Sequence, residues 1–171
     1  MIQNDCNKLR ILYVEDEYDA REQTMMLLQE HFDTVFSAAN GKEGLETYEK
    51  EPCDLVITDI KMPIMDGVEM VQSIRQINPA QPVMVVSAYD FSDKLRPFLE
   101  REVEFFLAKP YHPENLLKAI RDICEEHKAV NGNSGEMDSE ATITALRRRV
   151  ADLEKELMLM EQKLRDHGID Y

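Results

Sequence analysis

Short apolar runs alternate with longer segments of mixed character between residues 10 and 127. Continuous apolar runs are typical of strands in a parallel sheet that is buried on both faces, while apolar residues at helical spacing among charged ones indicate helices. Five strands are predicted in this way, at residues 10–14, 34–38, 55–58, 83–86 and 104–108. Five helices are predicted to alternate with them, at residues 17–31, 42–50, 68–77, 91–100 and 114–127.

The strict alternation of strands and helices predicts an α/β fold of three layers, with a doubly wound, five-stranded parallel sheet at its centre. Parallel strands joined by helices need right-handed crossovers, and the common order for five such strands is 2-1-3-4-5. That order changes direction between the first and third strands, so a crevice is expected where these two strands end. Ligands of such sheets bind in this crevice, beyond the carboxyl ends of the strands.

The rest of the chain has a different composition. Residues 129–140 are polar and contain Gly and Asn, which is typical of a flexible linker between a first domain at residues 8–128 and a C-terminal helix at residues 141–167. The apolar residues of that helix recur at alternating steps of three and four, as in a coiled coil. They are Ile143, Leu146, Val150, Leu153, Leu157, Met160 and Leu164. A homodimer through residues 143–164 is predicted, and β-branched Ile143 and Val150 favour a parallel over an antiparallel arrangement. The alternatives are a helix that folds back onto the first domain or docks on another protein.

Charge, hydrophobicity and cysteine content indicate which partners and which cellular location to expect. The formal net charge is −14, so a phosphate backbone would repel the chain as a whole, and direct nucleic-acid binding is not expected. No apolar run approaches the length of a membrane span, and the N-terminal residues lack the pattern of a secretory signal. Cys6, Cys53 and Cys124 are odd in number and widely spaced, so we interpret them as free thiols in a reducing cytosol. A cytoplasmic protein is therefore expected.

Polar residues directly follow four of the predicted strands. Glu15 and Asp16 follow the first strand, Asp59 the third, Ser87 the fourth and Lys109 the fifth. Parallel strands end at the same edge of a sheet, so these side chains are expected to converge. Crowded carboxylates repel one another unless a cation holds them, and a set of oxygen ligands favours Mg²⁺. Asp16 and Asp59 are the predicted direct ligands, with Glu15 binding directly or through water.

The same residues can receive a phosphoryl group. A carboxylate oxygen of Asp59 can attack phosphorus and form an acyl phosphate. The Lys109 ammonium and the Ser87 hydroxyl would then offset the charge on the phosphoryl oxygens. Each residue also has an ordinary explanation when taken singly, as a helix cap, a turn residue or a solvated strand end. Their joint occurrence at the ends of successive strands favours a functional site.

Residues 8–127 resemble the receiver domain of two-component response regulators. The resemblance is carried by Glu15-Asp16, by TDIKMPIMDG at residues 58–67, by Ser87-Ala88 and by Lys109-Pro110. It implies that Asp59 accepts a phosphoryl group from a histidine kinase or a phosphotransfer protein. It also implies that Asp16, Asp59 and the main-chain carbonyl of Lys61 hold Mg²⁺, and that the peptide bond between Lys109 and Pro110 is cis.

The resemblance further implies a switch and a control of phosphoryl lifetime. Ser87 and Phe106 match the switch pair, in which Ser87 moves toward the phosphoryl group and Phe106 turns inward; the alternative for Phe106 is an ordinary core side chain. Lys61 and Tyr89 lie two residues after Asp59 and Ser87, at positions that influence the lifetime, and slow autodephosphorylation is predicted. Two departures are mild, since Glu15 stands where Asp is commoner and Phe106 where Tyr is frequent.

The predicted function is therefore a phosphorylation-activated receiver, a phosphoacceptor that assists its own phosphorylation and dephosphorylation rather than a turnover enzyme. One alternative is a Mg²⁺-dependent phosphohydrolase of the haloacid-dehalogenase type, which also uses an aspartate nucleophile. That class has a D-x-D pair after the first strand, where this chain has Glu15-Asp16-Glu17. The other alternative is a non-enzymatic scaffold in which the C-terminal coil is the function.

Overall fold

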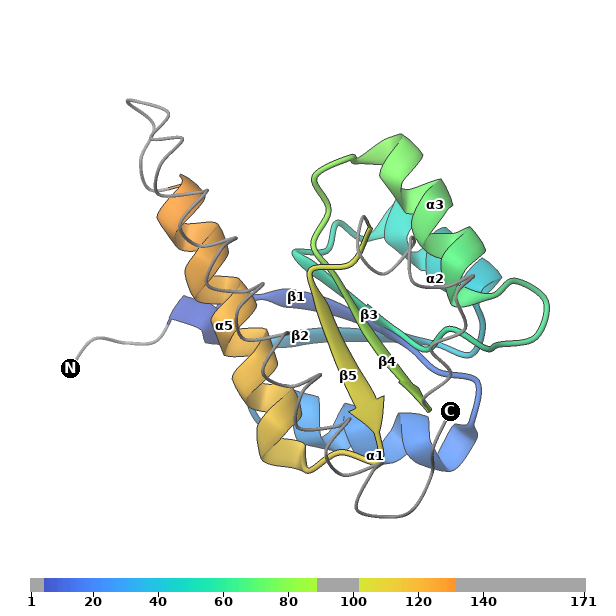
Figure 1. Cartoon of the computed structure of the whole chain (residues 1–171), viewed down its shortest axis with the longest axis horizontal. Helices are drawn as coiled ribbons and strands as arrows, with labels where there is room; N and C mark the ends of the chain where they lie inside the picture. Colours follow the sequence, from blue (N-terminus) through green and yellow to red (C-terminus); the bar gives the residue numbers. More distant parts are fainter. Residues whose placement is uncertain (1–4, 89–101, 132–171) are drawn as a thin grey trace, which may run out of the picture. The chain divides into compact units, whose positions relative to one another are not determined.

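A five-stranded parallel sheet forms the centre of the structure, a computed structural model that describes residues 5–88 and 102–131 (Figure 1). The strands are ordered β2-β1-β3-β4-β5, and every neighbouring pair is parallel. Their bounds are β1 Arg10–Val14, β2 Thr34–Ala38, β3 Leu55–Thr58, β4 Val83–Ala88 and β5 Phe105–Lys109. The predicted fold class and strand order are confirmed.

Helices connect the strands and follow the last one. A short 3₁₀ helix, η1 Asp5–Lys8, precedes β1, and the α-helices are α1 Tyr18–Gln29, α2 Gly41–Lys50, α3 Gly67–Ile77 and α5 Pro113–Asn131. Their ends lie within two residues of the predicted ones, except that α5 continues to Asn131, into the segment predicted as a linker. The predicted helices at residues 91–100 and 141–167 lie outside the described residues. No helix in the described part combines the length and the apolar character that a membrane crossing requires.

The helices cover the two faces of the sheet in pairs (Figure 1). Successive residues of a strand point to opposite faces, so Ile11 and Tyr13 of β1 face one side while Leu12 and Val14 face the other. The first pair packs in a core cluster with α1 and α5 residues, including Leu28 and Leu116. The second pair packs with residues of α2 and α3. The sheet is therefore buried on both faces, as its continuous apolar strands predict.

Strand register and one close backbone approach place the ends of β1 and β3 side by side. Val14 pairs with Thr58, and the Asp59 N–H donates to the Val14 carbonyl at 3.0 Å. After β3, the chain turns into α3 through Asp66, which caps the helix by accepting from the Glu69 N–H at 2.8 Å. At Gly67, a Cβ would lie 2.0 Å from the Asp59 carbonyl oxygen, so the turn needs glycine at this position.

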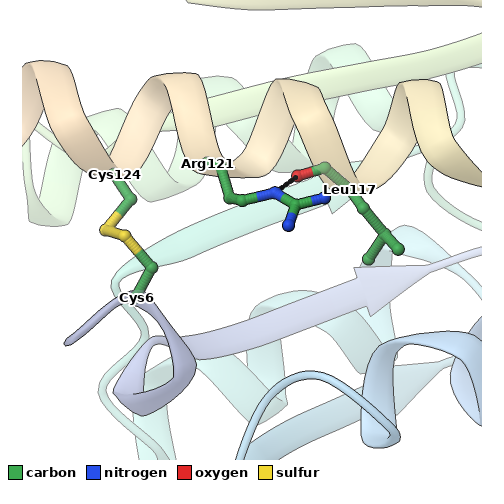
Figure 2. Close-up of a disulfide and its surroundings, with 4 residues drawn as sticks. All are labelled: Cys6, Leu117, Arg121 and Cys124. Atoms are coloured by element: carbon green, nitrogen blue, oxygen red, sulfur yellow. Dashed lines mark hydrogen bonds between the residues drawn. A yellow bond between two sulfur atoms is a disulfide. The ribbon is translucent and has the colours of Figure 1, made fainter. Parts of the chain in front are cut away.

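A disulfide joins Cys6 of η1 to Cys124 of α5, and it corrects the interpretation of these residues as free thiols (Figure 2). The two Cα atoms lie 6.0 Å apart, although the cysteines are separated by 118 positions in the sequence. They meet because α5 runs back along the sheet toward the end at which β1 begins, and η1 lies directly before β1. Only Cys53 is free in the described ranges; burial raises the pKa of its thiol to about 11. The cysteines therefore no longer support a location in a reducing cytosol.

Reduction of this disulfide is expected to lower the free energy of unfolding by about 4–5 kcal/mol, because the bond restricts a long loop in the unfolded chain. Urea unfolding with and without a reductant, followed by circular dichroism, measures the difference. Replacing the free thiol with Cys53→Ser should preserve this sensitivity to reductant, whereas Cys6→Ser should abolish it. Coincident transitions with and without reductant, or three thiols titrating in the denatured but unreduced protein, would contradict the disulfide.

Candidate functional site

One ammonium group joins two of the predicted acidic residues at the carboxyl ends of the strands. Lys109, the last residue of β5, donates from Nζ to Oε2 of Glu15 at 2.5 Å and to Oδ2 of Asp59 at 2.7 Å. Glu15 follows β1 and is 2% exposed, while Asp59 follows β3 and is 8% exposed. The predicted convergence of these three residues is confirmed.

The Asp59 carboxylate is held in one orientation by donors to both of its oxygens. Oδ1 accepts from the Ile60 N–H at 2.5 Å, from the Ser87 hydroxyl at 2.7 Å and, at 3.3 Å, from the Lys61 N–H. Oδ2 accepts from Lys109. The predicted site residue Ser87 is therefore in contact with Asp59 from the neighbouring strand β4, and it is itself buried. A carboxylate fixed in this way presents its oxygens in a defined direction.

Hydrogen bonds and charge keep Lys109 protonated. Burial alone would lower the pKa of the ammonium, but the hydrogen bonds and negative charges of Asp59 and Glu15 more than offset this effect and raise the pKa above its ordinary value. Two carboxylates and one ammonium leave one net negative charge among these three side chains. The site therefore attracts a further cation.

Two residues that the sequence analysis missed hold the segment after β1. Tyr13 donates from its hydroxyl to Oε2 of Glu15 at 3.2 Å, and burial raises the pKa of this phenol far above its ordinary value, so the donor stays protonated. Arg21 of α1 donates from Nη1 to the main-chain carbonyls of Glu15 at 2.6 Å and Asp16 at 3.3 Å. Strand alternation places Tyr13 on the same face as Glu15, and this signal was available in the sequence.

The loop between β3 and α3 contains a residue in an unusual conformation. Ile64 has a φ of 72° and is 77% exposed. A β-branched residue rarely adopts positive φ, so the backbone is strained at this point of the TDIKMPIMDG segment. The strain lies in the same short loop that carries Asp59 at its start and the cap Asp66 at its end.

The remaining predicted residues are placed as follows. Phe106 lies in β5, is half-buried, and packs against the core cluster on the α2 and α3 face. Lys61 is exposed, and its N–H contributes to the Asp59 hydrogen bonds described above. Tyr89 lies outside the described residues. The peptide bond between Lys109 and Pro110 is cis, as the resemblance implied.

The three predicted metal-binding acids are only partly assembled. Glu15 and Asp59 meet at Lys109, whereas Asp16 is exposed. In residues 5–88 and 102–131, no three carboxylate, imidazole or thiol side chains form a group that could hold a metal ion. The residue types nevertheless fit a hard cation, since two carboxylates converge, a third is next in sequence to one of them, and the charge among them is negative.

Comparison with known proteins identifies the class of protein that has this fold and site. The response regulator receiver domain family matches residues 11–121, and the chain belongs to this family. Receiver domains are the phosphoacceptor modules of two-component signalling and are not turnover enzymes. This result sets aside the phosphohydrolase alternative. Mg²⁺ is the metal that the family typically uses.

Two curated relatives are matched over most of their own length. The sporulation initiation phosphotransferase F of Bacillus subtilis is 33% identical over 116 residues, which are 66% of this chain and 90% of that protein. The chemotaxis protein CheY of Halobacterium salinarum is 27% identical over 114 residues, 67% of this chain and 95% of that protein. These two matches cover 66% and 67% of this chain, so the rest of it has no counterpart in either alignment.

Solved structures are similar to most of the chain. The N-terminal domain of an uncharacterized protein from Wolinella succinogenes has a TM-score of 0.66 and 36% identity, covering 71% of this chain and 98% of that chain. A CheY-like receiver domain protein from Methanospirillum hungatei has a TM-score of 0.65 and 29% identity with the same coverage. The architecture described above is thus the receiver architecture.

Proposed function

We propose that Asp59 accepts a phosphoryl group from a histidine kinase or a phosphotransfer protein, with Mg²⁺, and that this step changes an output surface or the C-terminal helix. The observation that supports the proposal most directly is the position of Lys109, whose ammonium contacts Asp59 and Glu15 together. An acyl phosphate on Asp59 would add negative charge beside the Glu15 carboxylate. The ammonium already lies where that charge would develop.

The transfer step follows from the geometry of Asp59. A carboxylate oxygen forms a bond to phosphorus while the phosphorus–nitrogen bond of the donor phosphohistidine breaks, and the imidazole leaves with the bonding electrons and takes up a proton. Lys109 and Ser87, both hydrogen-bonded to Asp59, donate to the phosphoryl oxygens as the charge moves onto them. Mg²⁺, when bound, supplies a second positive charge for these oxygens. Glu15, Asp16, Asp59 and the main-chain carbonyl of Lys61 are the groups that would hold it.

Ser87 and Phe106 form the switch in this proposal. Ser87 donates to Asp59, and a phosphoryl group on Asp59 would offer the hydroxyl a new acceptor farther from the backbone. Phe106 pairs in register with Val85, two residues before Ser87 on β4. A movement of Ser87 would therefore displace the part of β5 that carries Phe106. Its half-buried ring can turn inward only if space opens. We propose that the output face comprises the predicted helix at residues 91–100 together with β5 and α5, by analogy with the receiver family.

Phosphoryl lifetime is proposed to be long. Lys61, whose side chain is exposed, lies two residues after Asp59, and Tyr89 lies two residues after Ser87. In this proposal both side chains hinder the approach of a hydrolytic water. Decay of the purified phosphoprotein, compared with a variant in which both residues are alanine, measures their effect. An unchanged half-life would remove this part of the proposal.

We also propose a homodimer through residues 143–164 and a cytoplasmic location, with no direct nucleic-acid or membrane partner. The support for the dimer is the heptad pattern, and the support against nucleic acid is the net charge of −14. The support for the location is the receiver relationship, since the cysteines no longer provide it. A downstream protein that reads the output face completes the proposed set of partners.

The mass of the intact protein after treatment with acetyl phosphate and Mg²⁺ tests the phosphoacceptor. Wild type should gain one phosphoryl group, and Asp59→Asn should gain none, because an amide oxygen does not form the acyl phosphate. Asp54→Asn is a matched control at the other end of β3, where the amide oxygen can still accept from the Arg10 N–H. No gain in wild type, or an equal gain in Asp59→Asn, would favour the scaffold alternative.

The dimer is tested by light scattering of the full chain and of a version that ends at Asn131, each with and without beryllofluoride. The full chain should have the mass of a dimer, whereas the shortened chain should be a monomer without the phosphoryl mimic, because the heptad stripe is missing. A monomeric full chain under both conditions, or a shortened chain that dimerises equally well, would contradict the coiled-coil proposal.

A further inference from the structure

We propose that Tyr13 is a positioning residue for the acidic site: its hydroxyl fixes the long side chain of Glu15, so that this carboxylate stays beside Asp59 and Lys109. The inference rests on the proposed function, since it concerns how one of the proposed metal-binding groups is held. It adds a residue that lies inside the sheet rather than at its edge. Nothing in the resemblance to receivers assigned a role to this position.

The contact itself is buried and specific. Tyr13 is fully buried in β1, and Glu15 is 2% exposed two residues later on the same face of the strand. Oε2 of Glu15 accepts from the Tyr13 hydroxyl at 3.2 Å and from Lys109 Nζ at 2.5 Å. A buried carboxylate is costly unless donors satisfy it, and the phenol supplies one donor without bringing another charge.

The length of the Glu15 side chain explains why a second donor is useful. Glutamate has one more rotatable bond than aspartate, so its carboxylate can occupy more positions around the same backbone. Lys109 alone does not define the position, because its own side chain is long and it is shared with Asp59. With donors from two directions, a single Oε2 position satisfies both. The departure from the commoner Asp is thereby matched by a tyrosine two residues earlier.

The packing of Tyr13 makes it a rigid anchor. Its ring belongs to the core cluster that contains Leu28 of α1 and Leu116 of α5, with Tyr111 packed against the same cluster. Beside it, the hydroxyls of Thr24 and Tyr111 hydrogen-bond to each other at 3.3 Å and join α1 to the segment after β5. A ring held on several sides keeps its hydroxyl in one place, as a supporting group for a metal ligand must.

A double-mutant cycle of Tyr13→Phe and Glu15→Asp tests the coupling. Mg²⁺ affinity is measured by NMR titration, and the rate of labelling by acetyl phosphate is measured at limiting and at saturating Mg²⁺. Tyr13→Phe should weaken Mg²⁺ binding by about tenfold, because mutations of groups that orient a metal ligand have effects of this size. Its labelling rate should recover at saturating Mg²⁺. In the Glu15→Asp background, the same change should alter the affinity by less than about twofold, because the shorter carboxylate does not depend on the phenol.

Tyr48→Phe is the matched control, since it removes another buried tyrosine hydroxyl that donates to Gln81 at 2.8 Å on the opposite face of the sheet. It should leave Mg²⁺ affinity unchanged in both backgrounds. The inference is overturned if Tyr13→Phe lowers Mg²⁺ affinity equally with Glu and with Asp at position 15, or does not lower it at all. If Asp59 is still labelled in that case, the proposed function remains intact. Coupled Mg²⁺ binding without any labelling would instead support Tyr13 and refute the phosphoacceptor.

Discussion

The site depends on one cation between two buried carboxylates. Asp59 and Glu15 are almost excluded from water, and two ionised carboxylates in such surroundings repel each other strongly unless a positive group lies between them. Lys109 provides that group from the end of β5, and it contacts both. The sheet order brings the ends of β1, β3 and β4 to the same edge, so the fold creates the repulsion and Lys109 relieves it.

The same arrangement prepares the site for added negative charge. Ser87 and two backbone N–H groups hold one oxygen of Asp59, which leaves the other with the ammonium. Behind Glu15, Tyr13 and the backbone contacts of Arg21 fix the segment that follows β1. The segment that carries Glu15 is thus supported by a neutral hydroxyl from the core, that of Tyr13, and by the Arg21 side chain of α1.

Much of this could be predicted from the sequence, because it follows from periodicity. Continuous apolar runs fix the strands, their alternation with helices fixes the sheet type, and residues such as Asp59 and Lys109 then fall at one edge by geometry alone. The contact between Tyr13 and Glu15 depends on side-chain rotamers, which spacing suggests but does not determine. The disulfide between Cys6 and Cys124 depends on where α5 packs, and no local pattern connects positions so far apart.

The most direct measurement of the central claim compares wild type with Lys109→Met for both Mg²⁺ binding and the rate of labelling by acetyl phosphate. Removal of the ammonium should leave Mg²⁺ affinity equal or higher, because a cation that competes for the same carboxylates is gone. The labelling rate at saturating Mg²⁺ should fall by about a hundredfold, as for the loss of one charge-stabilising donor. A labelling rate equal to that of wild type would contradict the account.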